Sequence, residues 1–200
     1  MDAAARLSTR ARPASHPNPG VACILVRDEI VVGRGWTATG GRPHAEAAAL
    51  AQAGDAARGA TAYVTLEPCA HRSERGPACC DLLAHAGVAR VVAGVEDPDP
   101  RTAGEGLARL RRAGVATELL SSSAAQASLA GYLARAAHAR PHVTMKIAMS
   151  LDGCIATAGG ESQWITGPQA RAHVHAQRAR ADAILVGGGT WRADRPRLDV

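Results

Sequence analysis

Short apolar runs alternate with helical patterns over most of the chain. Runs rich in Val, Ile, Leu and Ala predict strands at 21–26, 29–36, 61–66, 89–95 and 115–119. Stretches of helix-favouring residues that close on a glycine predict helices at 44–54, 78–87 and 102–114. The first two strands form a plausible hairpin that turns at Arg27-Asp28. The later alternation of strand and helix predicts a mostly parallel sheet with helices on both faces.

A second unit is expected after a proline break. The serine run 121–123 can cap a helix that extends to about Ala139, and Pro141 then interrupts the chain. Beyond the break, the pattern predicts a helix that has Pro168 near its first turn. The expected elements are strands at 142–150 and 182–190 and this helix at 167–181. A boundary near Arg140 therefore predicts one domain over 1–140 and another over 141–200.

Composition narrows the class of protein. The chain is 46% hydrophobic but contains no Phe, so its core must be built from Ala, Val, Leu and Ile. No apolar stretch reaches the roughly eighteen residues of a membrane-spanning helix, and the N-terminal segment lacks a hydrophobic signal core. A cytoplasmic, reducing location is expected, where clustered cysteines are metal ligands or catalytic groups more often than disulfides.

The positive net charge is compatible with general solubility or, more specifically, with an anionic small-molecule substrate. The net charge is +5, but no Lys/Arg block is long enough for a nucleic-acid tail. An anionic small molecule fits this balance, because a phosphate needs only one or two well-placed cations.

Candidate metal chemistry lies in two segments. His44 and Glu46 open one predicted helix, Cys69 follows a predicted strand, and Cys79 opens the next predicted helix. Imidazole nitrogen and thiolate sulfur are tetrahedral zinc ligands, and a catalytic zinc site has three protein ligands and an open position. Helix N-termini favour the thiolate form. Zinc makes hydroxide available near neutral pH, and Glu46 would carry a proton from water to a leaving amine.

H-x-E followed by P-C-x-x-C is the signature of zinc nucleobase deaminases, here with a longer spacing between the cysteines. The alternative without a metal site is that His44 caps its helix, Glu46 is solvated and the cysteines are buried and free. This alternative requires the positions of all four residues to match a metal site by accident. Another alternative is a structural zinc site, which would need a fourth ligand from Cys80 or His71. Cys80 is otherwise interpreted as a core residue.

Four stretches resemble the deaminase half of the bifunctional riboflavin biosynthesis family. They are "SHPNPGVACILV", "GRPHAEAAAL", "ATAYVTLEPCAHRSERGPACCDLL" and "VEDPDPRTAGEGL". The segment from "VTMKIAMSLDG" through "ESQWITGPQA" to "RPRL" resembles the start of the family's reductase half. The resemblance implies a cytidine-deaminase-like three-layer α/β/α sandwich, followed by the start of a dihydrofolate-reductase-like α/β domain.

The resemblance also implies the reaction and its residues. It implies deamination of 2,5-diamino-6-ribosylamino-4(3H)-pyrimidinone 5′-phosphate, and reduction of the ribosyl chain with NADPH. The implied zinc ligands are His44, Cys69 and Cys79, with Glu46 as the proton shuttle. Asn18, His71 and Arg75 match substrate-contacting positions, the last two at the phosphate.

In the second unit, the resemblance implies substrate contacts by Ser162 and Arg178. It implies NADPH contacts by Ala148, Trp164, Thr190 and Asp194, and Lys146 matches a further reductase position. About sixty residues follow the boundary, which is too few for a complete nucleotide-binding sheet. The chain is therefore expected to be C-terminally truncated and to deaminate without reducing.

Two other functions stay open at this stage. One is a zinc deaminase for another nucleobase or nucleoside, although such enzymes usually have the short C-x-x-C spacing. The other is a non-catalytic zinc module. The expected partner is a phosphorylated pyrimidine, with no nucleic acid and no membrane, and an assembly of identical chains stays open.

Overall fold

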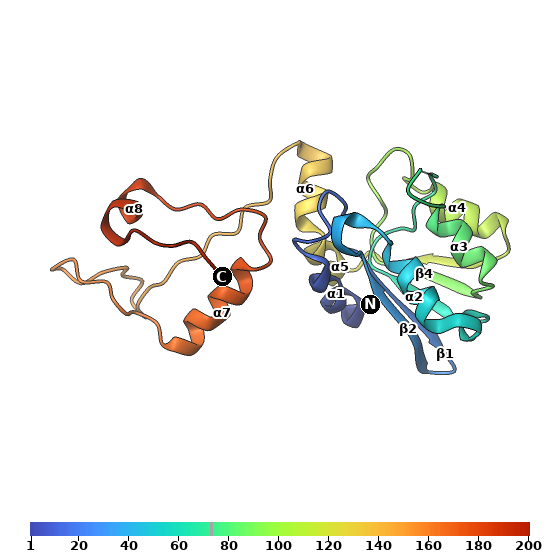
Figure 1. Ribbon diagram of the computed structural model, residues 1–200, viewed down its shortest axis with the longest axis horizontal. Coiled ribbons are helices and arrows are strands. Elements are labelled where there is room, and N and C mark those ends of the chain that lie inside the picture. The colour runs from blue at the N-terminus through green and yellow to red at the C-terminus, as the bar shows by residue number, and fades with distance from the viewer. Residues whose placement is uncertain (73) are drawn as a thin grey trace. The chain divides into compact units, whose positions relative to one another are not determined.

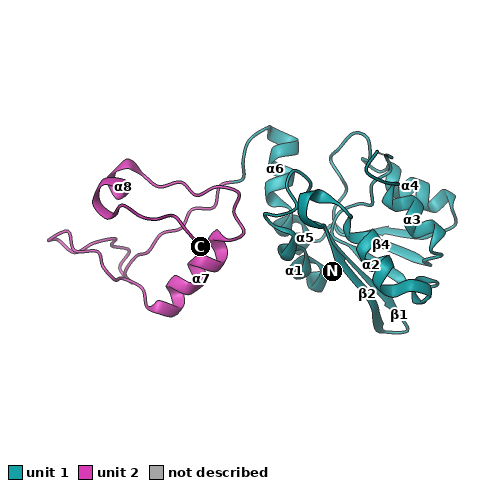
Figure 2. Cartoon of the chain, viewed as in Figure 1, with its two compact units in different colours: residues 1–142 teal, residues 143–200 magenta. Residues whose placement is uncertain are grey.

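The computed structural model describes residues 1–72 and 74–200. These residues divide into two compact units, Met1–His142 and Val143–Val200 (Figure 2). None of the described helices combines the length and the hydrophobicity that crossing a lipid bilayer would need.

Unit 1 contains one mixed sheet with the strand order β2-β1-β3-β4-β5 (Figure 1). The strands are β1 (Ala22–Arg27), β2 (Ile30–Trp36), β3 (Thr61–Val64), β4 (Arg90–Ala93) and β5 (Ala116–Leu119). β1 is antiparallel to both β2 and β3, whereas β3, β4 and β5 are parallel. The hairpin pair and the two parallel pairs agree with the prediction, so the expected parallel pairing is wrong only for β1 and β3. The connection that follows β2 returns the chain to the starting end of the sheet, so β3 has the same direction as β2. Because β1 lies between these two strands, β3 pairs with β1 in the antiparallel sense.

The predicted hairpin between β1 and β2 is confirmed, but its turn lies one residue later than expected. Asp28 and Glu29 form the turn and both have positive φ, 51° and 61°. A two-residue type I′ turn requires this backbone conformation, which matches the twist of the flanking strands.

Helices cover both faces of the sheet and give the predicted three-layer sandwich (Figure 1). The helices of unit 1 are α1 (Asp2–Ser8), α2 (Ala45–Ala53), α3 (Cys79–His85), α4 (Glu105–Arg112), α5 (Ser123–Ser128) and α6 (Ala130–His138). Single turns of 3-10 helix occupy Thr9–Ala11, Thr39–Gly41 and Gly54–Ala57. On one face α3 packs between α2 and α4, and on the other α1 packs against α5 and β1.

The helix predicted to extend to Ala139 is two helices. Ser122 caps the first, because its hydroxyl accepts the backbone N–H of Ala125 at 3.3 Å. The chain bends at Leu129, which is 2% exposed and packs in the core. Leu129 ends α5 and begins α6.

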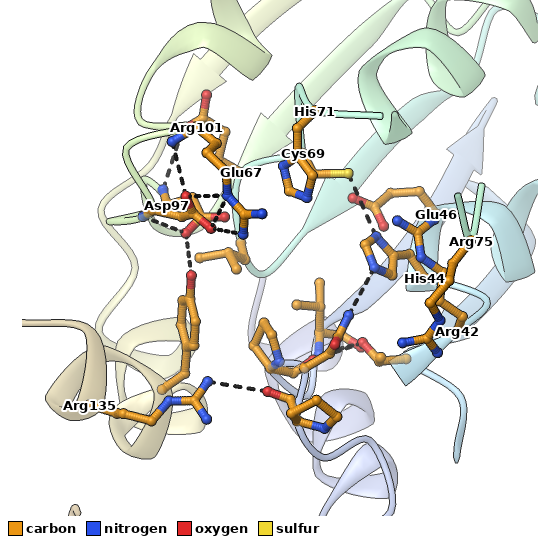
Figure 3. Close-up of a pocket in the computed structure, with 18 residues that line it drawn as sticks. Arg42, His44, Glu46, Glu67, Cys69, His71, Arg75, Asp97, Arg101 and Arg135 are labelled. Carbon is orange, nitrogen blue, oxygen red and sulfur yellow. Dashed lines mark hydrogen bonds and ion pairs between the residues drawn. The ribbon is translucent and has the colours of Figure 1, made fainter. Parts of the chain in front are cut away.

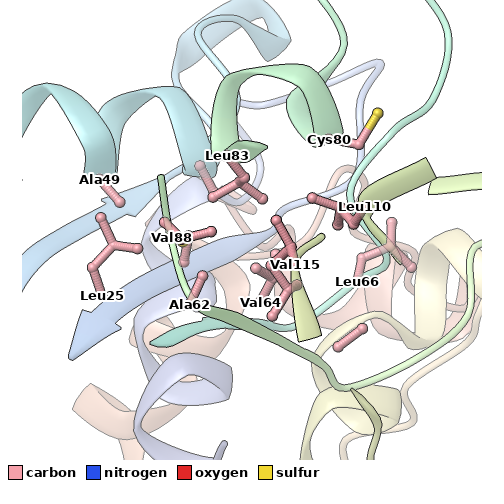
Figure 4. Close-up of a cluster of buried hydrophobic side chains, with 14 of the residues drawn as sticks. Leu25, Ala49, Ala62, Val64, Leu66, Cys80, Leu83, Val88, Leu110 and Val115 are labelled. Atoms are coloured by element: carbon pink, nitrogen blue, oxygen red, sulfur yellow. The ribbon is translucent and has the colours of Figure 1, made fainter. Parts of the chain in front are cut away.

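The core between the sheet and the α2–α4 layer consists of small and branched side chains (Figure 4). Leu25, Val64 and Val91 on the strands face Leu83 and Leu110 on the helices, and all five are fully buried. The absence of Phe from the sequence is thus compatible with a closely packed interior.

Two glycines bring α2 unusually close to β2. A Cβ atom at Gly35 would lie 2.2 Å from the carbonyl oxygen of Ala45, and one at Gly33 would lie 2.4 Å from that of Ala49. Only hydrogen can occupy these positions. The contact fixes the N-terminus of α2, where His44 and Glu46 lie, against the sheet.

Unit 2 contains two helices, α7 (Pro168–Arg178) and α8 (Gly188–Asp194). The predicted helix with Pro168 in its first turn is confirmed. The strands predicted at 142–150 and 182–190 are wrong: no strand is formed within the described residues 143–200. Val143 and Met145 are each 79% exposed and Leu185 is 96% exposed. An apolar run becomes a strand only where a neighbouring strand pairs with its backbone.

Candidate metal centre

Three side chains from three segments converge at one edge of the sheet. His44 is the N-cap residue of α2, Cys79 is the first residue of α3, and Cys69 follows the carboxyl end of β3. His44 Nδ1 lies 3.3 Å from the Cys79 sulfur and 3.7 Å from the Cys69 sulfur. All three ligand atoms lie within 4.8 Å of one another.

The two sulfurs differ in their electrostatic environment. Cys69 accepts the backbone N–H of Cys79 at 3.3 Å. Hydrogen bonding from the Cys79 thiol, more than any other cause, lowers the pKa of Cys69 to about 4. The same hydrogen bond and burial raise the pKa of Cys79. Cys69 is thus the more acidic sulfur of the pair, and the thiolate is the form in which a cysteine binds metals.

The cluster fits a zinc ion. Zinc–nitrogen bonds of about 2.0–2.1 Å and zinc–sulfur bonds of about 2.3 Å at tetrahedral angles place ligand atoms roughly 3.5 Å apart. The spacings of 3.3 and 3.7 Å agree with this value. Within the described residues the cluster contains these three members only. Three protein ligands are typical of a catalytic zinc site, whereas a structural site has four.

The side chains considered as a fourth ligand are engaged elsewhere. Cys80 is 1% exposed and belongs to the hydrophobic core, as predicted (Figure 4). His71 lies 3.5 Å from the hydroxyl of Thr102. The geometry therefore argues against a closed structural zinc module.

Glu46 is the buried acid of the site. It lies in the first turn of α2, is 3% exposed and shares a hydrogen bond with the Cys79 thiol. Burial raises the pKa of this carboxyl, and the nearby His44 opposes the shift in part. A carboxyl group with a raised pKa can both take up and release a proton near neutral pH.

A cavity of 330 Å³ opens beside the cluster and is also lined by His44, Glu46 and Cys69 (Figure 3). The three substrate positions predicted for this half, Asn18, His71 and Arg75, all line it. Asn18 Nδ2 lies 3.2 Å from His44 Nε2, and the guanidinium of Arg75 donates to the carbonyl oxygen of Gly40 at 2.6 Å.

Sequence reasoning missed the other charged residues and the tyrosine that line the cavity. These residues are Arg42, Glu67, Asp97, Asp99, Arg101, Tyr132 and Arg135. The polar run "DPDPR" follows the parallel strand β4, and ligand sites gather at the carboxyl ends of parallel strands, so this signal was available. Tyr132 and Arg135 lie on α6, and nothing in the local sequence places that helix beside the cavity.

Glu67 connects the cysteine segment to this missed wall. Its carboxylate is 2% exposed and accepts the backbone N–H groups of Gly104 at 2.9 Å, Leu107 at 3.0 Å and Asp97 at 3.3 Å. An anion at the N-terminus of α4 satisfies N–H groups that the helix itself leaves unpaired. Glu67 therefore fixes the loop that contributes Asp97 and Asp99 to the cavity.

The residues predicted for the reductase half lie in unit 2, where no side chain among the described residues 143–200 is fully buried. Ser162, Trp164, Thr190 and Asp194 are exposed, and Ala148 and Arg178 are half-buried. None of them lines either of the two cavities described for the molecule. Trp164 packs against the guanidinium of Arg171, 4.5 Å from the ring centre.

Two family models match parts of the chain. Residues 1–95 match the cytidine and deoxycytidylate deaminase zinc-binding region, and residues 141–200 match the RibD C-terminal domain. Riboflavin biosynthesis protein RibD of Escherichia coli (strain K12) is 50% identical over 100% of this chain and 54% of its own length. The RibD of Haemophilus influenzae is 47% identical, again over 100% of this chain and 54% of its own length.

Solved structures agree with the sequence comparison. Form 1 of Acinetobacter baumannii RibD is similar with a TM-score of 0.83 and 43% identity, over 99% of this chain and 56% of that one. A second similar structure is the diaminohydroxyphosphoribosylaminopyrimidine deaminase/5-amino-6-(5-phosphoribosylamino)uracil reductase of Thermotoga maritima. Its TM-score is 0.87 and its sequence identity 35%, over 98% of this chain and 57% of that one. The chain spans about half the length of the curated relatives it matches. On its fold, its metal cluster and its identity to these proteins, the chain belongs to the RibD family of riboflavin biosynthesis proteins.

Proposed function

We propose that this chain carries out the zinc-dependent deamination of 2,5-diamino-6-ribosylamino-4(3H)-pyrimidinone 5′-phosphate. The observation that carries the proposal is the three-member cluster of His44, Cys69 and Cys79 with the buried, non-ligand Glu46 beside it. The name of the Thermotoga maritima relative supports the choice of substrate.

The cluster residues would hold the metal, and the other side chains would handle protons and substrate. When bound, zinc supplies a Lewis acid that makes hydroxide available near neutral pH. Glu46 would take a proton from water and deliver it to the leaving amino group. The amino group is replaced by a carbonyl oxygen, so the reaction consumes water and releases ammonia.

Two residues of the cavity suit the phosphorylated part of the substrate. Arg75 is held at the cavity by its hydrogen bond to Gly40, and His71 lies beside Thr102. A guanidinium group binds phosphate through charge-assisted hydrogen bonds. Asn18 lies against His44 and suits either the orientation of that ligand or contact with the substrate.

We further assign the deaminase domain to residues 1–140 and the first part of an NADPH-dependent reductase domain to 141–200. The match of 141–200 to the RibD C-terminal domain supports this assignment. All five cysteines are free, which fits a reducing, cytoplasmic location. The partner we propose is a phosphorylated pyrimidine.

The test is release of ammonia from this substrate by the zinc-loaded chain, compared with the Glu46→Gln variant. Gln keeps the shape of Glu but cannot exchange the proton, so turnover should fall by about 10²–10⁴-fold. Native mass spectrometry should still find one zinc per chain in the variant. A variant that retained more than about a tenth of the original rate would remove Glu46 from proton transfer. A zinc-loaded, unaltered chain that released no ammonia would reject the proposed function.

A further inference from the structure

The part of the cavity away from the metal ligands is formed by two segments that are distant in sequence. Asp97 follows β4, and Tyr132 and Arg135 come from α6. Figure 3 shows Asp97 and Arg135 on one side of the cavity and His44 and Glu46 on the other. A substrate whose base reaches Glu46 would extend its remaining groups toward the Asp97 side.

Asp97 is held in one orientation. The hydroxyl of Tyr132 donates to Asp97 Oδ1 at 2.5 Å, and the backbone N–H of Asp99 donates to the same oxygen at 3.0 Å. The Asp97 backbone N–H is itself fixed by Glu67 at 3.3 Å. The residue is only 7% exposed, so few other rotamers are available to it.

The arginines beside Asp97 have other partners. Arg101 donates to Asp99 at 2.9 Å, and Arg135 donates to the carbonyl oxygen of Pro17 at 3.2 Å. Among the described residues, both hydrogen bonds that the Asp97 side chain receives end on Oδ1. Asp97 therefore offers its second oxygen, Oδ2, as an acceptor for a ligand.

The chemistry of an acceptor-only group selects the part of the substrate that it can bind. A carboxylate repels a phosphate and binds hydroxyl or amino donors. The leaving amino group belongs at Glu46, across the cavity. The sugar hydroxyls extend farther from the reacting carbon than the remaining amino groups of the base, so we assign them to Asp97. Burial and the hydrogen bond to Asp97 raise the pKa of Tyr132, so its hydroxyl stays protonated and remains a donor.

We propose that Tyr132 is a positioning residue that fixes Asp97 so that the free carboxylate oxygen accepts a hydrogen bond from a sugar hydroxyl of the substrate. The inference rests on the proposed function and adds a specificity role for α6. Loss of the Tyr132 hydroxyl removes one of the two hydrogen bonds that hold Asp97 Oδ1, so the carboxylate is fixed less firmly and this one contact weakens. It leaves the metal cluster and Glu46 unchanged.

The test measures binding of the phosphorylated diaminopyrimidine by calorimetry to the zinc-loaded Glu46→Gln chain, which holds the substrate without turnover. Adding Tyr132→Phe should raise Kd by roughly tenfold, the range expected for a hydrogen bond to a charged group. Tyr63→Phe is the matched control: it removes the hydroxyl of the chain's other tyrosine, which lies on β3 and does not line the cavity. Its Kd should not change.

Two further measurements separate positioning from a general loss of structure. A substrate analogue that lacks the sugar hydroxyls should bind equally to chains with and without Tyr132→Phe. In an Asp97→Asn background Tyr132→Phe should add little, because coupled residues are not additive. Equal weakening for substrate and analogue, or an unchanged Kd for the substrate, would overturn the inference while the ammonia assay still supported the proposed function. Absence of ammonia release from the unaltered chain would reject both.

Discussion

The sulfur of Cys69 contributes charge as well as position to the metal cluster. Its pKa of about 4 makes it a thiolate at neutral pH, and the backbone N–H of Cys79 points at it from 3.3 Å. The Cys69→Ser variant should lose the zinc, since a serine hydroxyl is not deprotonated under these conditions. It should also melt at a lower temperature than the zinc-loaded chain, because metal binding is linked to folding.

Native mass spectrometry and thermal melting with and without zinc check this prediction. Cys154→Ser is the control, since Cys154 is exposed and lies in the other unit. One zinc per chain in the Cys69→Ser variant would show that Cys69 is not a ligand.

Arg75 is the residue on which the proposed phosphate contact depends most. Replacement by Ala should raise KM for the phosphorylated substrate by about tenfold or more, the cost of a charge-assisted hydrogen bond, and should leave KM for the dephosphorylated analogue nearly unchanged. Arg72→Ala is the control: Arg72 lies three residues away, pairs with Asp81 at 3.5 Å and does not line the cavity. If both substrates lost affinity equally, Arg75 would not bind the phosphate and His71 would be the next candidate.

Among the elements, the contact between β2 and α2 decides where the metal cluster forms. An added Cβ at Gly35 would lie 2.2 Å from a carbonyl oxygen and 2.5 Å from a backbone nitrogen of α2, and neither can move without moving the helix. Gly35→Ala should therefore destabilise the chain by about 3 kcal/mol, at the upper end of overpacking effects. It should also lower zinc affinity, because α2 carries His44.

Denaturant unfolding and zinc titration check the Gly35 prediction. Gly131→Ala on α6 is the matched control, since an added Cβ there meets nothing within 4 Å. That change should stabilise the chain slightly, by about 0.5–1 kcal/mol, because alanine favours a helix more than glycine does. A Gly35→Ala chain as stable as the original would show that α2 can shift without cost.

At the scale of the whole molecule, the two units differ in how completely they bury their apolar side chains. Unit 1 has a closed core with a sheet and two helical layers, whereas unit 2 exposes Val143, Met145 and Leu185. The residues predicted to contact NADPH lie in unit 2, and Trp164, one of them, is 72% exposed. Hydride transfer requires cofactor and substrate to be held in a fixed geometry.

We therefore expect this 200-residue chain to release ammonia but not to oxidise NADPH. The measurement follows NADPH absorbance with the deaminated product as substrate, and the control omits that product. Steady oxidation that depends on the product would show that the second unit is competent on its own. Substituting Trp164→Ala should then reduce that oxidation.

The sequence by itself determined the metal-binding cluster and most of the elements of unit 1. His44, Glu46, Cys69 and Cys79 could be found because their types and their positions at strand ends and helix starts are local properties. The capping serine, the hairpin and the helix at Pro168 were predictable for the same reason. Residues matched by resemblance, such as Asn18 and Arg75, lie at the cavity, and their roles stay predictions.

Tertiary structure alone decided the features that depend on distant contacts. β3 is antiparallel to its neighbour because it pairs with β1 and not with β2, and no local pattern records that choice. Tyr132 on α6 reaches Asp97 across 35 positions of sequence, and only the packing of the chain brings these two residues together. The apolar runs of unit 2 have strand propensity but form no ladder, because a strand is stabilised by partners that lie elsewhere in the chain.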